Sequence, residues 1–179
     1  VALAHEQILR DARQFSEAIE MLNTAIQSVP GDKDLLYARA LIAEKLNLLE
    51  VTERDLREIL KQDPKNVNAL NALGYTLTDR TTRYDEAHEL LQQAMELKPD
   101  DAFIMDSMGW LQYRRGNTAE ALKYLRRALE IRNDAEIAAH LGEVLWAQGQ
   151  RDEARKVWNS ALKLAPDNEV LRNVMQKFK

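Results

Sequence analysis

The chain has 179 residues, of which 45% are hydrophobic and 30% charged, a composition typical of a globular protein with room for a core. Its 25 lysines and arginines are outnumbered by 29 acidic residues, and the formal net charge of −4 argues against a nucleic-acid partner, because such proteins need a net basic face. Cysteine is absent, so disulfides and thiolate metal sites are excluded, while cytoplasm and periplasm both stay open.

The prolines recur at one phase of a repeat. They are Pro30, Pro64, Pro99 and Pro166, separated by 34, 35 and 67 residues. The last spacing equals two repeats, and Asn133 stands where the missing proline would be. Because proline cannot continue a helix, each one is predicted to mark the end of a repeating unit.

Taken in chain order, the repeat predicts five units of two antiparallel helices and one further helix. The units are expected at 1–32, 33–66, 67–101, 102–134 and 135–168. The second is the most divergent, with Asn47 and Leu48 at the place of a turn glycine. The last helix, 169–179, is expected to cover the open apolar end of the stack through Val170, Leu171, Val174, Met175 and Phe178. No Gly/Ser linker interrupts the series, which indicates one continuous domain over 1–179.

Small residues recur at fixed offsets within the units. Near the start of successive units lie Ala40, Gly74, Gly109 and Gly142, and later in each unit lie Ala18, Thr52, Ala87, Ala121 and Ala154. Two helices cross closely only where neither carries a bulky side chain, so Gly109 and Ala121 are predicted to mark the crossing within one unit. Gly116 and Gly149 fall between two helices, where a positive φ favours glycine. A phosphate loop at Gly109 is not expected, because this glycine falls inside a helix.

This unit of about 34 residues resembles the tetratricopeptide repeat. The resemblance implies an all-α, right-handed superhelical solenoid of antiparallel helix pairs, with about five repeats and a C-terminal capping helix. The first helices of successive units would line a concave face, which is the default ligand surface and includes Glu44 and Ala139. The candidate partner-binding residues on it are Tyr37, Asn71, Tyr75, Asp79, Phe103, Asp106, Trp110, Tyr113, His140, Glu143 and Trp146.

The chemistry of these residues favours polypeptide recognition. Aromatic side chains offer large apolar area at low entropic cost together with a polar tip. The alternative, that Tyr75, Trp110 and Trp146 pack against an adjacent helix, remains open. Members of the family that clamp a C-terminal carboxylate use lysine, asparagine and arginine on these helices, whereas this chain has Asp79, Asp106 and Glu143 there, alongside Asn71. We therefore expect a basic or amide-rich ligand rather than a carboxylate.

No catalytic, metal or cofactor site is expected. His5, His88 and His140 fall in different units and at different repeat positions, which disfavours a metal triad or an acid–base pair. The fourth unit gathers cations, namely Arg114, Arg115, Lys123, Arg126, Arg127 and Arg132. These are predicted to form a solvated, partly salt-bridged face rather than an RNA groove. The chain is therefore expected to be no enzyme.

Three segments carry a narrower resemblance. ALNALGYTLTDR, DAFIMDSMGWLQYRRG and IAAHLGEVLWAQGQRDEARKVW resemble the C-terminal part of large bacterial tetratricopeptide outer-membrane lipoproteins. One of these assists a periplasmic carboxyl-terminal-processing protease in degrading cell-wall hydrolases. The resemblance implies a protein-binding adaptor at the periplasmic face of the outer membrane, although the sequence leaves the cytoplasm open. The alternative hypothesis is a self-associating assembly scaffold of an envelope or cytoplasmic complex.

The first residues carry no targeting signal. The sequence begins at Val1 rather than methionine, and no charged-then-apolar leader follows. No uncharged apolar run approaches the length that spans a membrane. We therefore expect a piece of a longer protein, in which any signal or lipid anchor lies upstream and any membrane attachment depends on that anchor.

Overall fold

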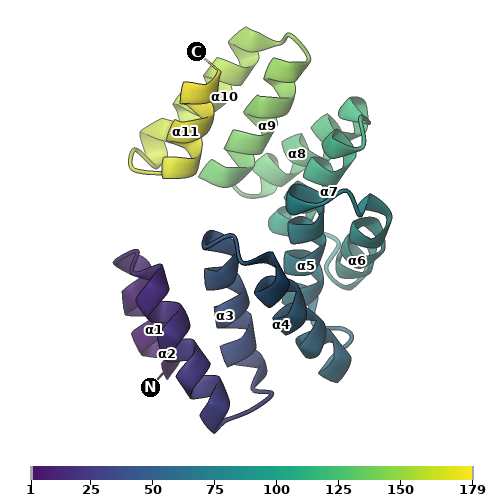
Figure 1. Cartoon of the computed structure of the whole chain (residues 1–179). Coiled ribbons are helices and arrows are strands. Elements are labelled where there is room, and N and C mark those ends of the chain that lie inside the picture. The colour runs from purple at the N-terminus through teal and green to yellow at the C-terminus, as the bar shows by residue number, and fades with distance from the viewer. Residues whose placement is uncertain (1, 179) are drawn as a thin grey trace.

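The computed structural model describes residues 2–178, which form eleven α-helices, namely five sequential antiparallel pairs and a capping helix (Figure 1). They are α1 Ala2–Asp11, α2 Phe15–Ser28, α3 Lys33–Lys45, α4 Leu49–Gln62, α5 Val67–Arg80, α6 Tyr84–Leu97, α7 Ala102–Arg114, α8 Thr118–Ile131, α9 Ala135–Ala147, α10 Arg151–Leu164 and α11 Glu169–Lys177. The expected all-α solenoid is confirmed. Residues 1 and 179, the outer limits of the first unit and of the last helix expected from the sequence, lie outside the described residues.

The start of each unit after the first is fixed by an Asp or Asn side chain. Those that cap α3, α5, α7, α9 and α11 are Asp32, Asn66, Asp101, Asp134 and Asn168, and each accepts a hydrogen bond from a backbone N–H of the first turn. Such a bond satisfies an N–H that has no partner within the helix. Each cap lies two residues after the proline that ends the preceding unit, or directly after Asn133, which stands in place of that proline. The sequence therefore ends one unit and begins the next within three residues.

The two helices of a unit touch where the small residues lie. A Cβ added at Gly109 would stand 2.7 Å from Cγ of Leu125 and 3.2 Å from the carbonyl oxygen of Ala121. At Gly142 the same atom would stand 1.9 Å from Nε1 of Trp158. The predicted crossing between Gly109 and Ala121 is therefore confirmed, and the large residue after each crossing fills the remaining space.

Four of the five turns within units contain a left-handed residue, and the turn between α5 and α6, residues 81–83, has none. Gly116 and Gly149 take φ values of +84° and +80°, as the sequence predicted. In the first two units, which lack this glycine, Arg13 adopts φ 61° and Asn47 adopts φ 58°. The divergence of the second unit thus leaves its turn geometry intact, since asparagine tolerates this conformation better than most residues.

The second unit contains a buried ion pair. Asp55 on α4 is 1% exposed, and its two carboxylate oxygens accept hydrogen bonds of 2.6 and 2.8 Å from the guanidinium of Arg39 on α3. A charge removed from water in this way is tolerated only with a well-placed partner. The pair therefore joins α3 to α4 by polar contact beside the apolar packing of Leu56 and Ile59.

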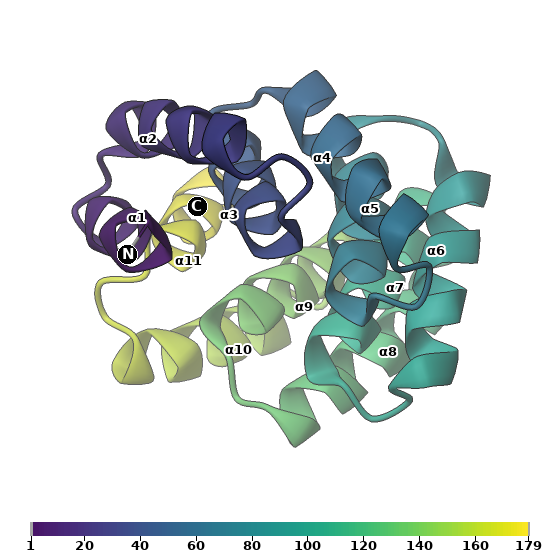
Figure 2. The ribbon, with the colours of Figure 1, turned by 90° about the horizontal axis from the view of Figure 1, so that it is seen from below.

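The stack is curved, and its two ends lie on the same side of the molecule (Figures 1 and 2). At the C-terminal end, α11 buries Leu171 against the last pair, and the ring of Phe178 lies 5.8 Å from that of Trp158. Val170, expected to take part in this cover, is instead exposed, because it lies on the outer side of α11. An ion pair between Arg13, in the first turn, and Glu169, at the start of α11, connects the two ends.

Candidate functional site

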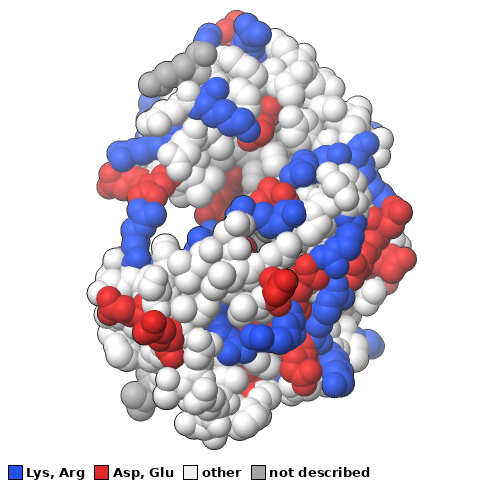
Figure 3. All heavy atoms as spheres, viewed as in Figure 1, with Lys and Arg blue, Asp and Glu red and all other residues white. Residues whose placement is uncertain are grey.

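The first helices of the units line a groove of about 290 Å³ on the concave side of the stack. Most of its lining comes from α3, α5 and α7, with Thr52 and Leu56 from α4 and Glu136 and His140 from α9. Figure 3 shows acidic side chains in the hollow between the two halves of the curved stack. The groove is therefore a concave surface built on helices, which hold side chains more rigidly than loops do.

A histidine cluster forms one wall of the groove. Nδ1 of His140 on α9 lies 2.9 Å from a carboxylate oxygen of Asp106 on α7, and Nε2 lies 3.5 Å from the hydroxyl of Tyr75 on α5. The imidazole stacks on the indole of Trp110, with ring centroids 4.6 Å apart. Burial lowers the pKa of His140, but the negative charge of Asp106 and its hydrogen bond outweigh burial and raise the pKa above its usual value. The cluster joins three units through their first helices.

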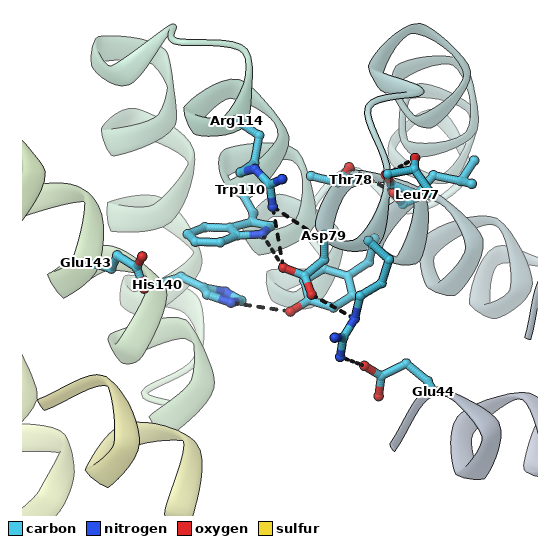
Figure 4. Close-up of polar contacts among 12 residues, drawn as sticks. Glu44, Leu77, Thr78, Asp79, Trp110, Arg114, His140 and Glu143 are labelled. Atoms are coloured by element: carbon cyan, nitrogen blue, oxygen red, sulfur yellow. Dashed lines mark hydrogen bonds and ion pairs between the residues drawn. The ribbon is translucent and has the colours of Figure 1, made fainter. Parts of the chain in front are cut away.

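A second polar network surrounds Asp79 at the end of α5 (Figure 4). Its carboxylate accepts a 3.2 Å hydrogen bond from Nε1 of Trp110, and its backbone carbonyl accepts a 3.1 Å bond from Arg114. Arg80 pairs with Asp79 at 3.1 Å and with Glu44 on α3 at 3.1 Å. The network therefore ties α3, α5 and α7 together along the edge of the groove and fixes the shape that a ligand meets.

The groove gathers six of the residues predicted from the sequence. Its lining includes Tyr37, Asn71, Tyr75, Phe103, Asp106 and His140. Among them, Phe103 is the most accessible, with 41% of its surface exposed. Asn71 presents a different feature, because its side-chain oxygen is buried and accepts no hydrogen bond from the described residues.

The other predicted residues lie outside the groove. Trp110 is only 7% exposed because it is held between His140 and Tyr113, so the packing alternative left open for it is the one observed. Glu143 pairs with Lys177 of α11 at 3.1 Å. Trp146 packs against Trp158 and Phe178. Asp79 serves the network at the edge of the groove, and Ala139, also placed on this face, is fully buried in the core.

Sequence reasoning missed Glu136, which lines the groove from the first turn of α9. The repeat itself carried the signal. Counted from the helix caps, Glu136 holds the position that Phe103 holds in α7 and Asn68 in α5, and all three line the groove. Phe103 was already predicted to be an exposed aromatic residue. The residues at the same repeat position in the neighbouring units, Asn68 and Glu136, could therefore have been predicted from it.

The cations of the fourth unit are salt-bridged, as the sequence predicted. Their partners include Asp79 for Arg114, Asp85 for Arg115 and Glu153 for Arg126, and carboxylates close in sequence pair with the rest. Within residues 2–178, no three histidine or acidic side chains gather closely enough to hold a metal ion. None of the helices there combines the length and apolar character needed to cross a bilayer.

Comparison with known sequences decides the family. One tetratricopeptide repeat pattern matches residues 3–51 and 76–136, more than half of the chain, and another matches residues 112–178. The chain belongs to the tetratricopeptide repeat family. Repeats of this family form scaffolds for protein–protein interaction and are typically non-catalytic. The chain is accordingly a protein-interaction scaffold.

Relatives at the sequence level include two proteins of Pseudomonas aeruginosa. The chain is 49% identical over 141 residues to TPR repeat-containing protein PA4667, a match that covers 79% of this chain and 24% of that protein. It is 23% identical over 141 residues to the type IV pilus assembly protein PilF, covering 77% of this chain and 56% of that protein. The chain thus spans about a quarter of the length of the first relative and about half that of the second.

Solved tetratricopeptide structures share the fold. The thermophilic TPR protein TTC0263 of Thermus thermophilus superposes with a TM-score of 0.85 at 23% identity, covering 96% of this chain and 93% of that one. A crystal structure of MamA gives a TM-score of 0.64 at 19% identity, covering 90% of this chain and 88% of that one. At these identities the likeness concerns the fold alone.

Proposed function

We propose that this tetratricopeptide scaffold is a non-catalytic adaptor that binds a polypeptide segment in its concave groove. The observation that carries the proposal is the combination of an exposed aromatic, Phe103, with the unpaired side-chain oxygen of Asn71 in the same groove. A polypeptide offers both complements, because its side chains cover apolar surface while its backbone N–H groups donate hydrogen bonds. Leaving a buried oxygen without a donor costs about 1–3 kcal/mol in the free protein, and a bound N–H would recover part of that free energy.

Rigidity of the groove supports the same function. The contacts of His140 with Asp106, Tyr75 and Trp110 join α5, α7 and α9 within the protein itself. A binding surface that is already ordered loses little conformational entropy when a partner arrives, so more of the contact energy appears as affinity.

We propose further that the adaptor works in the bacterial envelope, beside a carboxyl-terminal-processing protease. The support is the resemblance of ALNALGYTLTDR and IAAHLGEVLWAQGQRDEARKVW to periplasmic lipoproteins of that kind. In this role the chain would hold the protease, its cell-wall hydrolase substrate, or both, and catalysis would belong to the protease. Attachment to the outer membrane would depend on an anchor outside this sequence.

Photo-crosslinking from inside the groove tests the adaptor function. A benzophenone amino acid in place of Phe103 is expected to crosslink to the bound polypeptide, because this side chain is exposed in the groove. The matched control carries the same group at Gln93, which is exposed on α6 outside the groove. The samples contain purified protease, a hydrolase substrate, or both. Equal crosslinking from the two positions would place the partner elsewhere and contradict the proposal.

Substitution of Phe103 provides the matching loss of function. Phe103→Ser is expected to lower partner capture while leaving the melting temperature nearly unchanged, since this ring is largely outside the core. Trp110→Ala would be a poor test, because Trp110 supports both His140 and Asp79 and its removal would disturb the groove itself.

Self-association is a second candidate function, favoured by exposed apolar side chains on α1. Ile8 is 66% exposed and Leu3 is 39% exposed on this helix. Repeats at the end of a solenoid stack against further repeats when their apolar face is uncovered. Light scattering across a concentration series is expected to show dimers that Ile8→Lys abolishes. A monomer at every concentration would exclude this function.

A further inference from the structure

The charged groups of the groove are almost all of one sign. Its lining contains four carboxylates, Glu44, Asp101, Asp106 and Glu136, and neither lysine nor arginine. His140, held by Asp106, is the only side chain of the lining able to carry positive charge. A cleft with carboxylates and low-dielectric walls concentrates negative potential within it.

The carboxylates differ in how far their charge is already balanced. Glu44 pairs with Arg80 at 3.1 Å, Asp101 caps α7 through two backbone N–H groups, and Asp106 is bound to His140. Glu136 forms no ion pair with any lysine, arginine or histidine among residues 2–178, although it lines the groove. At least one negative charge on the wall is therefore available to a ligand.

Tyr75, which lines the groove, lies within the electrostatic field of acidic side chains from four first helices. Burial raises the pKa of the Tyr75 hydroxyl, and the negative charges of Asp79, Asp106, Glu44 and Glu136 raise it further. Four acids on four different first helices thus act on one point, although 92 residues separate the first from the last in sequence. Because Glu44, Asp79 and Asp106 already have cationic partners, Glu136 supplies the charge that a ligand cation near that point can neutralise.

Apolar surface and a hydrogen-bond acceptor lie beside these charges. Tyr37, Leu41 and Phe103 line the same groove, and Tyr37 and Leu41 can cover the methylene groups of a long side chain. The guanidinium of Arg132 lies 4.9 Å from the centroid of the Phe103 ring, so this ring already accepts a cation on one face. Asn71 lies between Leu41 and Phe103 in sequence, on α5, and its unpaired oxygen requires a donor. An acidic wall, an apolar surface and an unsatisfied acceptor together match lysine or arginine within a peptide, because these residues have an aliphatic stem and a cationic end that only donates.

We propose that the groove selects a basic polypeptide segment, with a lysine or arginine side chain lying along Tyr37 and Leu41, its cation near Glu136, and a backbone N–H donating to Asn71. This inference rests on the proposed function and adds the sign of the ligand to it. The attraction is to the side-chain cation, so a segment of opposite charge is rejected.

Three fluorescently labelled peptides test the sign of the ligand. They have equal length and differ only in whether their polar positions are lysine, glutamine or glutamate, in a background of alanine with one leucine. By fluorescence anisotropy at low salt we expect the lysine peptide to bind about tenfold more tightly than the glutamine peptide, and the glutamate peptide most weakly. Added salt should reduce this difference, because it screens the partly exposed charges.

Two variants separate the charge from the hydrogen bond. Glu136→Gln is expected to weaken the lysine peptide about threefold and leave the glutamine peptide unchanged. The matched control is Glu89→Gln, which removes an exposed carboxylate on α6 outside the groove and should change neither. Asn71→Leu is expected to weaken both peptides while raising the melting temperature, because a buried unpaired acceptor is replaced by an apolar group. A merely structural role for Asn71 would lower both binding and stability.

The outcomes distinguish this inference from the proposed function. If the glutamine or glutamate peptide binds as tightly as the lysine peptide, the selection of basic segments is wrong and the groove remains a polypeptide site. If none of the peptides binds, the inference is overturned, and crosslinking from position 103 then decides separately whether the adaptor function stands.

Discussion

Substitution of Gly142 by alanine should be among the most damaging single-methyl changes in the chain. The added Cβ would lie 1.9 Å from Nε1, 2.3 Å from Cε2 and 2.6 Å from Cδ1 of Trp158. Ordinary contact begins at 3.4 Å, so the indole must move by about 1.5 Å. Trp158 is 1% exposed and stacks on Trp146 and Phe178, so a rigid ring has little room for this movement.

The magnitude follows from three contributions. Overpacking of this kind costs about 1–3 kcal/mol. Displacement of Trp158 also breaks the 3.3 Å hydrogen bond that its Nε1 donates to the carbonyl oxygen of Ala139, a loss of about 1 kcal/mol. Alanine restores about 1 kcal/mol through its higher helix propensity. We therefore expect Gly142→Ala to lower the free energy of unfolding by about 1–3 kcal/mol.

Urea unfolding followed by far-UV circular dichroism and tryptophan fluorescence provides the measurement. The double variant Gly142→Ala/Trp158→Leu tests the cause, because leucine is the residue that packs against Gly109 in the preceding repeat. In a double-mutant cycle the two changes should couple by about 1 kcal/mol or more in the favourable direction. A loss of stability below about 0.5 kcal/mol in Gly142→Ala, or additive effects in the cycle, would refute the close contact as the cause.

Three further predictions concern other parts of the stack. Asp55→Ala should lower the free energy of unfolding by about 3–5 kcal/mol in urea titrations, because it leaves the largely buried guanidinium of Arg39 without its carboxylate and with only the amide oxygen of Asn23 as an acceptor; a loss below about 1 kcal/mol would contradict this. Gly116→Ala should cost about 1 kcal/mol through backbone strain alone, since its φ is +84° and no atom lies within 4 Å of the added methyl; Gly116→Asn should cost less in the same measurement, and equal losses would count against strain. Because the pKa of His140 is raised in the folded state despite burial, its protonation stabilises the fold fully below the ordinary histidine pKa of about 6.5, and this contribution is lost as the pH rises through the folded pKa. Melting temperatures measured across that interval should fall for the parent chain more steeply than for His140→Gln, and parallel curves would oppose the assignment.

The fold could be predicted because its determinants are local and repeated. Proline spacing gives the period, and Gly109 with Ala121 gives the helix crossing, so the arrangement of pairs follows from residues a few turns apart. The helix caps are also determined locally, because each Asp or Asn cap lies next to the end of the preceding unit in the sequence.

The site was less predictable, because it depends on side-chain direction between helices. Sequence position placed Trp110 and His140 on the concave face, and only the structure shows that the indole and imidazole stack and so bury the tryptophan. Arg39 and Asp55 lie 16 residues apart on adjacent helices, and this spacing does not predict a buried ion pair. Such contacts depend on rotamers, which a repeat pattern does not specify.

The contact between Arg13 and Glu169 makes the curved stack an arch with a bridge across its open side, because it connects the first turn to the start of α11. Both side chains are more than half exposed, so the bridge is weak and is screened by salt. A partner that approaches the hollow across this ion pair would have to break it. Raising the ionic strength then has two opposing effects on binding in the groove. It weakens the ion pair between Arg13 and Glu169, and it also weakens the attraction of a basic polypeptide to the acidic wall.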